Sequence, residues 1–287
     1  MESETSADAP AAEPPKSAPA APEKKKKESW WETIRFLLLV FLFAIVIRTF
    51  IAAPFSIPSG SMLPRLMIGD YLFVAKWPYG YSRYSFPFGL ASFDGRIMGG
   101  VPDRGDVVVF RSPGPEDEDI VKRVIGLPGD TIQVRGGQVI LNGQPIPRTR
   151  IGDYLMPVSE NSPCRRVGPD SREVMEDGQR YCAYPRYRET LPEGRSYEVL
   201  DQNPDGDLDN TEVYRVPQGH LFMMGDNRDD SQDSRVPLEA GGYGMVPIEN
   251  VLGRALITFF STDGSSEWLL PWTWFSAMRW DRIGDTG

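Results

Sequence analysis

The longest apolar stretch of the chain lies near its N-terminus, where residues 36–47 form an unbroken run of 12 apolar residues. Twelve residues are too few to cross a bilayer, but residues 34–53 supply roughly 20 if Arg48 extends to the far interface. The pair Trp30–Trp31 is typical of the near interface. This pattern predicts one membrane-spanning anchor over residues 29–53.

A cleavable signal peptide and a buried core helix are the two alternatives for this segment. A signal peptide also has a short apolar core behind positive charge, but about 30 residues precede this one, and Pro54 follows the Ala52–Ala53 pair. A core helix would not explain the paired tryptophans or the basic run Lys24–Lys27. We therefore favour an uncleaved anchor.

The first 28 residues are rich in Ala, Pro, Glu and Lys and contain no large apolar residue except the initial Met. Such a segment cannot bury enough surface to offset its ordering entropy, so we expect a disordered tail over 1–28. Its lysines place this tail in the cytoplasm by the positive-inside rule. Residues 54–287 would then form an extracytoplasmic domain.

Beyond the anchor, short β-branched and aromatic runs alternate with Gly, Pro and Asp turns, which is typical of strands. The runs that predict strands are 71–77, 106–110, 120–127, 131–143, 196–200, 212–216, 220–225 and 254–260. Gly136–Gly137 predicts a hairpin turn. Residues 148–205 are proline-rich and predict irregular structure. The pattern therefore predicts a mostly β fold, an antiparallel-sheet domain with a smaller β and irregular subdomain inserted at about 131–215.

The C-terminal segment 267–280 carries four of the seven tryptophans. It is too short and too interrupted to span a membrane. Two interpretations remain open, a tail that covers the core and a segment that lies on the bilayer surface.

Charge and cysteines narrow the class of protein. A net charge of −9 and a pI near 4.9 argue against nucleic acid as the main partner. The two cysteines, Cys164 and Cys182, favour one disulfide outside the cytosol, with two buried thiols as the alternative. No zinc-type cluster of Cys and His occurs, so we expect no structural metal.

Two serines, Ser59 and Ser61, stand in a proline-flanked turn sequence and are candidate nucleophiles that lack an obvious base. The only histidine, His220, begins an apolar run, where a structural role is favoured. A Ser–Lys pair is the known variant, and it requires a buried, neutral lysine. Beyond residue 27 only Lys76 and Lys122 remain. Lys122 lies among apolar residues on a predicted strand, whereas Lys76 precedes a predicted loop and could extend into solvent, so Lys122 is the better candidate base.

A polar loop at 225–235, GDNRDDSQDSR, must satisfy itself by internal hydrogen bonds. It is either a surface loop or a brace for a catalytic lysine. In the second case Ser231 would hold the lysine, and Asp233 would pair with Arg235.

The acidic segment 201–212 matches the EF-hand loop template at positions 1, 3, 5, 6 and 12. Both flanks predict strands rather than helices, and Pro204 lies inside the loop. An acidic turn is therefore favoured over a calcium site.

Four segments now occur in order behind the apolar anchor: IPSGSMLPRLMIG (57–69), RGDVVVF (104–110), VKRVIGLPGD (121–130) and GDNRDDSQDSR (225–235). Together they resemble bacterial type I signal peptidases, membrane-anchored serine proteases that remove signal peptides from exported preproteins. The resemblance covers most of the outer domain apart from the inserted region.

It implies that Ser61 is the nucleophile and Lys122 the general base and later the general acid. The main-chain N–H of Ser61 and the hydroxyl of Ser59 would form the oxyanion hole. Ser231 would orient the Lys122 amine, and the surrounding loop would be braced by Gly225, Asp233 and Arg235.

The resemblance also implies cleavage after small residues in an Ala-x-Ala pattern, with the substrate added as an extended strand beside 55–59 and 119–122. The matching substrate-binding positions are Phe55, Ile57, Pro58, Met62, Leu66, Leu72, Val109, Asp119, Ile120 and Val121. Expected partners are preproteins, the bacterial inner-membrane bilayer and a nearby secretion translocon, with no cofactor. Ser61 lies eight residues past Ala53, so the site can be at most about 26–29 Å of chain from the anchor.

The best-studied members of the family have two membrane spans, whereas one is predicted here, so the membrane topology stays open. A self-cleaving Ser–Lys protein of the SOS-repressor kind would need a DNA-binding module and no anchor, the reverse of this pattern. A non-catalytic, anchored binding domain is the alternative from another class. It predicts a Lys122 that is exposed or too far from Ser61 to form a hydrogen bond.

Overall fold

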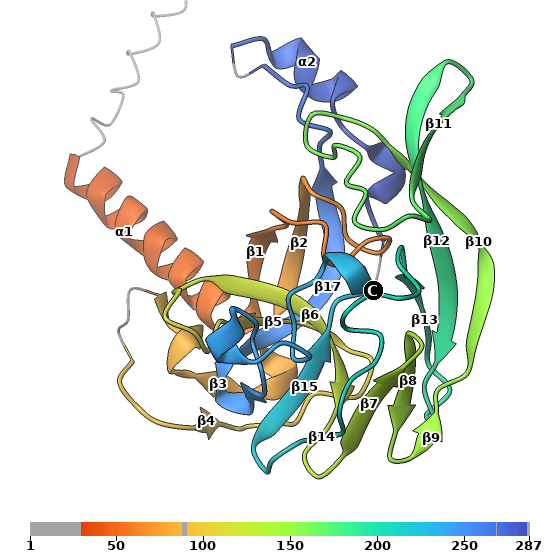
Figure 1. Cartoon of the computed structure of the whole chain (residues 1–287). Coiled ribbons are helices and arrows are strands. Elements are labelled where there is room, and N and C mark those ends of the chain that lie inside the picture. Colours follow the sequence, from red (N-terminus) through yellow and green to blue (C-terminus); the bar gives the residue numbers. More distant parts are fainter. Residues whose placement is uncertain (1–29, 88–90, 268, 286–287) are drawn as a thin grey trace, which may run out of the picture. The chain divides into compact units, whose positions relative to one another are not determined.

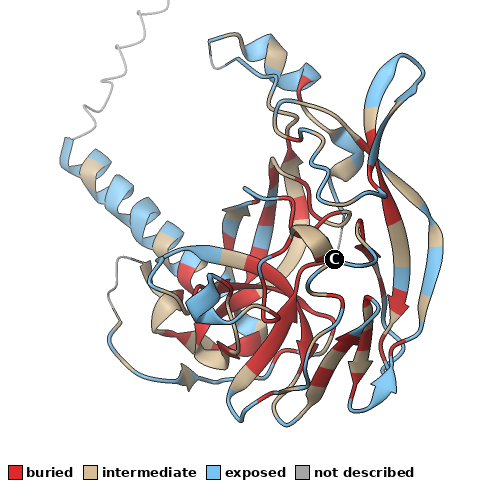
Figure 2. Cartoon of the chain, viewed as in Figure 1, coloured by how far each residue is buried: buried red, intermediate tan, exposed pale blue. Residues whose placement is uncertain are grey.

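The computed structural model describes residues 30–87, 91–267 and 269–285, so the tail predicted at 1–28 lies outside the described residues (Figure 1). The chain divides into a unit that ends at Leu42 and a second unit over residues 43–287. Helix α1 (Trp30–Val46) continues as a π-helical turn over Ile47–Ile51. Together they are long and apolar enough to cross a membrane, and most of their side chains are exposed (Figure 2).

This helical segment ends two residues before the end predicted for the anchor, because Ala52 and Ala53 already belong to strand β1 (Ala52–Ser56). Pro54 explains the difference. A proline disfavours helical backbone at the residue before it and has no N–H to donate.

The second unit is built around a seven-stranded antiparallel sheet that carries most of the predicted strands. Its order is β1, β2 (Asp70–Ala75), β17 (Val251–Ser261), β5 (Val107–Arg111), β6 (Asp119–Gly126), β15 (His220–Met224) and β16 (Val246–Pro247). β1 forms one edge of this sheet. The mostly β, antiparallel fold class predicted from the sequence is confirmed.

A smaller sheet confirms the predicted hairpin. It contains β14 (Tyr214–Arg215), β7 (Thr131–Arg135), β8 (Gln138–Leu141) and β9 (Gln144–Pro145). Arg135 pairs with Gln138 across the two-residue turn, and Gly136 and Gly137 have φ angles of 52° and 70°. Positive φ at both central residues is the type I′ geometry that glycine adopts without strain.

The prediction that 148–205 is irregular is wrong for most of this region, although the strand predicted at 196–200 is present. This region holds β10 (Arg148–Pro157), β11 (Arg172–Glu176), β12 (Gln179–Thr190) and β13 (Ser196–Leu200), with β12 paired to the other three. Charged residues along the exposed positions and Pro185 inside β12 hide the strand pattern. The turn at Asp177–Gly178, with φ angles of 50° and 79°, is the signal that could have revealed the β11–β12 hairpin.

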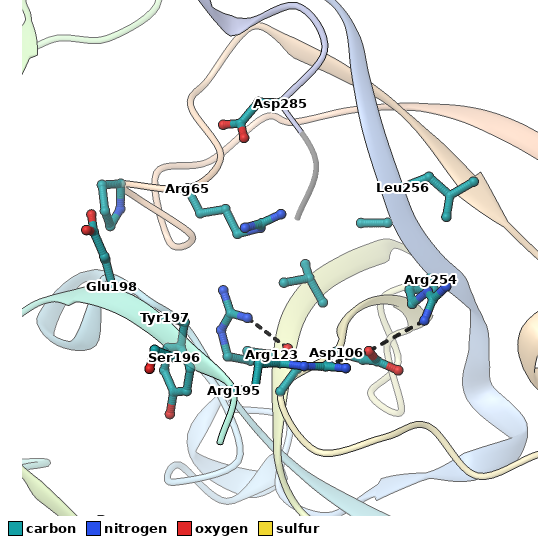
Figure 3. Close-up of a pocket in the computed structure, with 14 residues that line it drawn as sticks. Arg65, Asp106, Arg123, Arg195, Ser196, Tyr197, Glu198, Arg254, Leu256 and Asp285 are labelled. Carbon is teal, nitrogen blue, oxygen red and sulfur yellow. Dashed lines mark hydrogen bonds and ion pairs between the residues drawn. The ribbon is translucent and has the colours of Figure 1, made fainter. Parts of the chain in front are cut away.

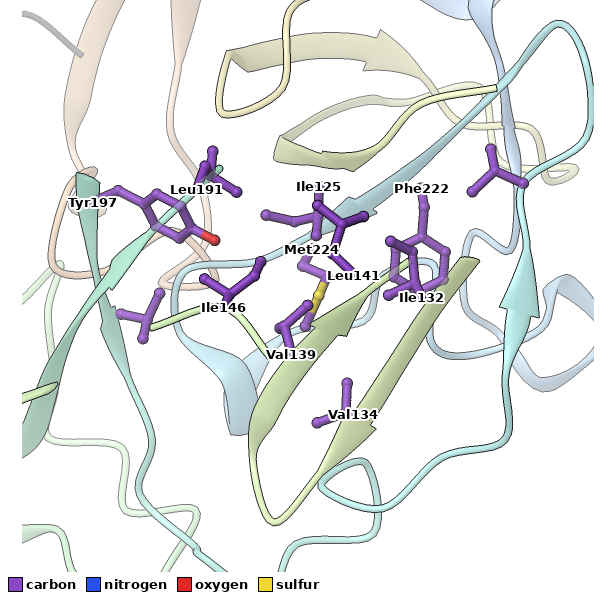
Figure 4. Close-up of a cluster of buried hydrophobic side chains, with 12 residues drawn as sticks. Ile125, Ile132, Val134, Val139, Leu141, Ile146, Leu191, Tyr197, Phe222 and Met224 are labelled. Atoms are coloured by element: carbon purple, nitrogen blue, oxygen red, sulfur yellow. The ribbon is translucent and has the colours of Figure 1, made fainter. Parts of the chain in front are cut away.

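The hydrophobic core lies between these sheets. One cluster fills the space between the β6–β15 region and the β7–β8 hairpin, with Ile125, Ile132, Phe222 and Met224 at its centre (Figure 4). A second cluster packs residues 57–66 against β2, β5 and β6. A third contains the disulfide partner Cys182 and packs it against Leu63. Cys164 and Cys182 are bonded, as the even cysteine count favours.

A two-stranded sheet and a short helix lie outside these larger sheets. Strands β3 (Tyr81–Ser82) and β4 (Arg96–Ile97) pair with each other. Helix α2 (Pro271–Ser276) lies in the Trp-rich segment and leaves Trp272 and Phe275 exposed. This exposure argues against a tail whose tryptophans cover the core.

Candidate active site

Ser61 is held in place by the apolar residues that follow it. After β1 the chain leaves the sheet, and Met62 and Leu66 insert into the core cluster that also contains Leu72. Because these side chains are buried, Ser61 itself is only 6% exposed. Met62, Leu66 and Leu72 were expected to contact substrate; instead they lie beneath the site and do not line its cavity.

The Lys122 side chain reaches Ser61 from the neighbouring part of the sheet. Its Nζ donates to Ser61 Oγ at 2.7 Å and to the Val121 carbonyl at 3.1 Å. Lys122 is 4% exposed. Burial lowers the pKa of its amine to about 8, although Asp233 and Asp226 favour the charged form. A measurable fraction of the amine is therefore neutral near pH 7 and can accept the serine proton.

The Ser59 hydroxyl lies beside the Ser61 hydroxyl. Ser59 Oγ lies 3.4 Å from Ser61 Oγ. The Ser61 N–H donates no hydrogen bond within the described part of the chain. An exposed hydroxyl and a free N–H beside a nucleophile can together receive a developing oxyanion.

Asn227 fixes the backbone of the serine turn, a role that the sequence analysis missed. Its N–H donates to the Ser61 carbonyl at 3.0 Å, and its Nδ2 donates to the Gly60 carbonyl at 3.1 Å. The clue was its position inside the 225–235 loop. Asn227 thereby connects that loop to the nucleophile directly.

The rest of the 225–235 loop is held by hydrogen bonds and an ion pair between its own residues. Asp233 pairs with Arg235 at 2.9 Å and also accepts the Gly225 N–H at 3.0 Å. A Cβ at position 225 would lie 2.2 Å from Ser231 Oγ and 2.7 Å from the Ser61 carbonyl, so only glycine fits there. Ser231 Oγ donates to the Gln232 carbonyl at 3.3 Å. No hydrogen bond joins Ser231 to Lys122 among the described residues, so the contact expected between them is not formed.

A cavity of about 520 Å³ opens at Ser61 and Lys122. Seven of the ten predicted substrate-binding residues line it, namely Phe55, Ile57, Pro58, Val109, Asp119, Ile120 and Val121. The lining residues missed from the sequence include Tyr243, whose ring centroid lies 5.9 Å from Lys122 Nζ, and Leu208, Val236, Glu118 and Arg165.

Two strand edges border this cavity and have free backbone groups. β1 is an edge strand, paired only with β2. β15 pairs with β6 only between residues 123 and 126, which leaves 119–121 without a strand on that side in the described structure. An extended peptide could therefore form main-chain hydrogen bonds on both sides.

The other candidate bases form no hydrogen bond with Ser61 in the part of the chain that the structure describes. Lys76 was expected to extend into solvent, but it is 5% exposed and donates to the Ser85 carbonyl at 2.8 Å. The short 3-10 turns at Trp77–Tyr79 and Arg83–Ser85 follow it and explain this burial, which lowers its pKa to about 8. His220 Nδ1 lies 3.1 Å from the Gln218 carbonyl. Burial alone therefore does not identify the base; contact with Ser61 does.

The acidic loop at 201–212 lies between strands β13 and β14, so it lacks the flanking helices of an EF hand. Carboxylate oxygens of Asp201, Asp209 and Asp229 lie within 4.8 Å of one another. Burial and the neighbouring carboxylates raise the pKa of Asp229 to about 6. Asp201 is also paired with Arg148, which already supplies positive charge.

Comparisons with known proteins identify the family of the chain. A family model described as "Signal peptidase, peptidase S26" matches residues 30–260. Signal peptidase I of Rickettsia canadensis is 38% identical over 240 residues, which cover 81% of this chain and 79% of that protein. Signal peptidase I of Rickettsia prowazekii is 39% identical over 231 residues, covering 78% and 77%. A crystal structure of a signal peptidase I from Enterococcus faecalis is 24% identical and covers 54% of this chain and 97% of that one, with a TM-score of 0.27 that is too low to bear on the fold. The sequence matches extend over most of the chain, which therefore belongs to the signal peptidase family, peptidase S26.

Proposed function

We propose that this chain is a membrane-anchored serine endopeptidase that removes signal peptides from exported preproteins, with Ser61 as nucleophile and Lys122 as general base. The observation that carries the proposal is the 2.7 Å hydrogen bond between Lys122 Nζ and Ser61 Oγ, made by a lysine that is 4% exposed. A non-catalytic binding domain would not need a buried amine against a serine hydroxyl.

The chemistry follows from these positions. The neutral Lys122 amine removes the Ser61 proton as Oγ attacks the scissile carbonyl carbon. The resulting oxyanion is stabilised by the Ser61 N–H and the Ser59 hydroxyl. The protonated Lys122 then donates to the leaving amine, which releases the mature protein and leaves the signal peptide as an ester on Ser61. Lys122 next deprotonates a water molecule, which attacks the ester carbonyl carbon. The bond from that carbon to Ser61 Oγ breaks, Lys122 returns the proton to Oγ, and the signal peptide leaves as a carboxylate.

Substrate recognition would use the two free strand edges. The peptide lies between β1 and the 119–121 part of β6, and its side chains before the scissile bond point toward Ile57, Val109 and Val121. These residues are close to fully buried, which leaves shallow apolar pockets that suit small side chains. This arrangement supports the expected Ala-x-Ala preference.

A cleavage assay tests this function. The purified full chain in detergent should cut a preprotein with alanine at the third and first positions before the scissile bond, at that bond. Replacing either alanine by tryptophan should lower kcat/KM by at least 100-fold, because the pocket would have to rearrange. Mass spectrometry of the products identifies the bond. Intact preprotein after long incubation, or equal cutting of the tryptophan substrates, would contradict the proposal.

The cleavage rate should depend on pH through Lys122. Only the neutral amine can accept a proton, and burial lowers its pKa to about 8. We therefore expect kcat/KM to fall about tenfold per pH unit well below pH 8 and to level off above it. Stopped cleavage assays between pH 6 and 10 measure this limb. A flat profile, or a midpoint near 10.5, would show that Lys122 is not a buried base.

The anchor and tail fit the same function. We infer an N-terminus in the cytoplasm of the bacterial inner membrane and a catalytic unit on the outer side, near the secretion translocon that delivers preproteins. The basic residues before α1 support this orientation. The exposed Trp272 and Phe275 of α2 support a tail that lies against the bilayer.

A further inference from the structure

A second cavity of about 690 Å³ is lined by neither Ser61 nor Lys122 (Figure 3). It is larger than the cavity at Ser61. Strand β6 contributes to both cavities. Because consecutive side chains of a strand point to opposite faces, Lys122 lines the first cavity and Arg123 the second.

Four arginines from separate parts of the chain line this second cavity. They are Arg65 from the segment after Ser61, Arg123 from β6, Arg195 before β13 and Arg254 from β17. The apolar part of the wall consists of Val107, Ala255 and Leu256 with Pro64. Three carboxylates, Asp106, Glu198 and Asp285, also line the cavity. The four guanidinium groups outnumber them, so the lining suits an anion that carries an organic group.

Three of these arginines already have carboxylate partners. Arg123 pairs with Asp226 at 2.6 Å, and both side chains are buried. Arg195 and Arg254 share Asp106, at 2.7 and 3.9 Å. One carboxylate thus serves two guanidinium groups, and their side chains are 43% and 40% exposed. Both groups keep donors that can turn to a ligand.

Arg65 is the exception. Its Nε is buried and has no hydrogen-bond partner, and its guanidinium takes part in no ion pair with any residue in the described ranges. Burial and the neighbouring charge of Arg123 lower its pKa, while Asp226 and Asp285 act in the opposite direction. A partly buried cation without a bonded partner is unfavourable unless a ligand satisfies it.

We propose that this cavity binds a phosphate group, held chiefly by Arg65 with Arg195 and Arg254. Guanidinium groups form charge-assisted, often bidentate bonds to oxyanions. The three arginines approach from different elements, so the ligand must offer oxygens in several directions. A tetrahedral phosphate does so, whereas a carboxylate offers two oxygens in one plane. The phosphate can belong to a soluble compound or to an anionic lipid headgroup.

Thermal unfolding of the full chain in non-ionic detergent tests the site. Inorganic phosphate should raise the unfolding midpoint saturably relative to chloride at equal ionic strength. Arg65→Gln should weaken the phosphate affinity at least tenfold, as measured by calorimetric titration. Arg254→Gln provides a second variant in case the first fails to fold. Arg180→Gln is the matched control, because Arg180 is exposed and lies outside the cavity; it should bind as wild type does.

Micelles that contain phosphatidylglycerol distinguish the two sources. If they stabilise wild type at lower concentration than inorganic phosphate does, and Arg65→Gln removes the effect, the ligand is a lipid headgroup. If inorganic phosphate is the stronger, the ligand is a soluble phosphate compound. The proposal fails if neither gives a saturable effect, or if Arg180→Gln weakens binding as much as Arg65→Gln does.

Discussion

Replacing Lys122 by methionine should abolish preprotein cleavage and at the same time stabilise the fold at neutral pH. Methionine fills similar space but cannot accept the Ser61 proton, so we expect kcat to fall by at least 1,000-fold, about as much as in Ser61→Ala. The gain in stability has a separate cause. Burial displaces the pKa of Lys122 from 10.5 to about 8, which corresponds to about 3 kcal/mol against folding when the amine is charged. Loss of the bonds to Ser61 and Val121 offsets about 1 kcal/mol of this gain.

The sign of the pH dependence follows from the lowered pKa. Between about pH 8 and 10.5 the unfolded chain holds the Lys122 proton and the folded chain does not, so wild-type stability rises with pH in that window. Below pH 8 the full penalty is present. Lys122→Met should therefore exceed wild type in stability most clearly below pH 8, and the difference should shrink toward pH 10.5. Urea unfolding of the full chain in detergent at pH 7 and pH 10 measures this difference.

Lys76→Met is the matched control. Lys76 is also buried, with a pKa lowered to about 8, but its amine contacts the Ser85 carbonyl. Its replacement should change stability in the same direction and leave cleavage within a few-fold of wild type. If both variants cleave normally, Lys122 is not the base. If both lose cleavage equally, burial of an amine rather than contact with Ser61 is what the reaction requires.

Most of the central sheet could be predicted from sequence, because its strands are short β-branched runs separated by clear turns. The β10–β12 region could not, since its exposed faces are polar and its central strand contains Pro185. Tertiary pairing with long neighbours overrides those local signals. The Asp177–Gly178 turn was the one local feature that pointed to strands there.

The catalytic pair could be predicted from the sequence for a different reason. With only two lysines beyond residue 27, a search for the base reduced to Lys76 or Lys122. The residues around that pair could not be predicted. Asn227 donates to a backbone carbonyl of the serine turn, and nothing in the sequence reveals that contact. The arginine-lined cavity was invisible for the same reason. Arg65, Arg123 and Arg254 come from distant parts of the chain, and only folding brings them together.

Glu189→Gln should be among the most destabilising single substitutions in the chain. Glu189, on β12, is fully buried and accepts two hydrogen bonds from Arg228, at 2.9 and 2.6 Å, and one from the Tyr197 hydroxyl. Arg228 is 2% exposed and lies in the turn that follows Asn227. Burial disfavours its charge, but Glu189 outweighs this and holds the pKa of Arg228 above its ordinary value.

Glutamine keeps the shape of Glu189 and removes its charge, which leaves Arg228 buried without a counter-ion. Breaking one side of a buried pair typically destabilises by about 3–5 kcal/mol. Asp94→Asn is the control, because Asp94 pairs with Arg83 at 3.5 Å and its side chain is 97% exposed; this change should stay within about 0.5 kcal/mol. Urea unfolding of the full chain measures both variants.

The double substitution Glu189→Leu with Arg228→Met should recover much of the loss, because it leaves no unpaired charge. A loss in Glu189→Gln no larger than in Asp94→Asn would show that the pair does not fasten the Asn227 turn to β12. If the double variant regains stability but cleaves preprotein more slowly than wild type does, Arg228 also positions Asn227 against the Ser61 backbone.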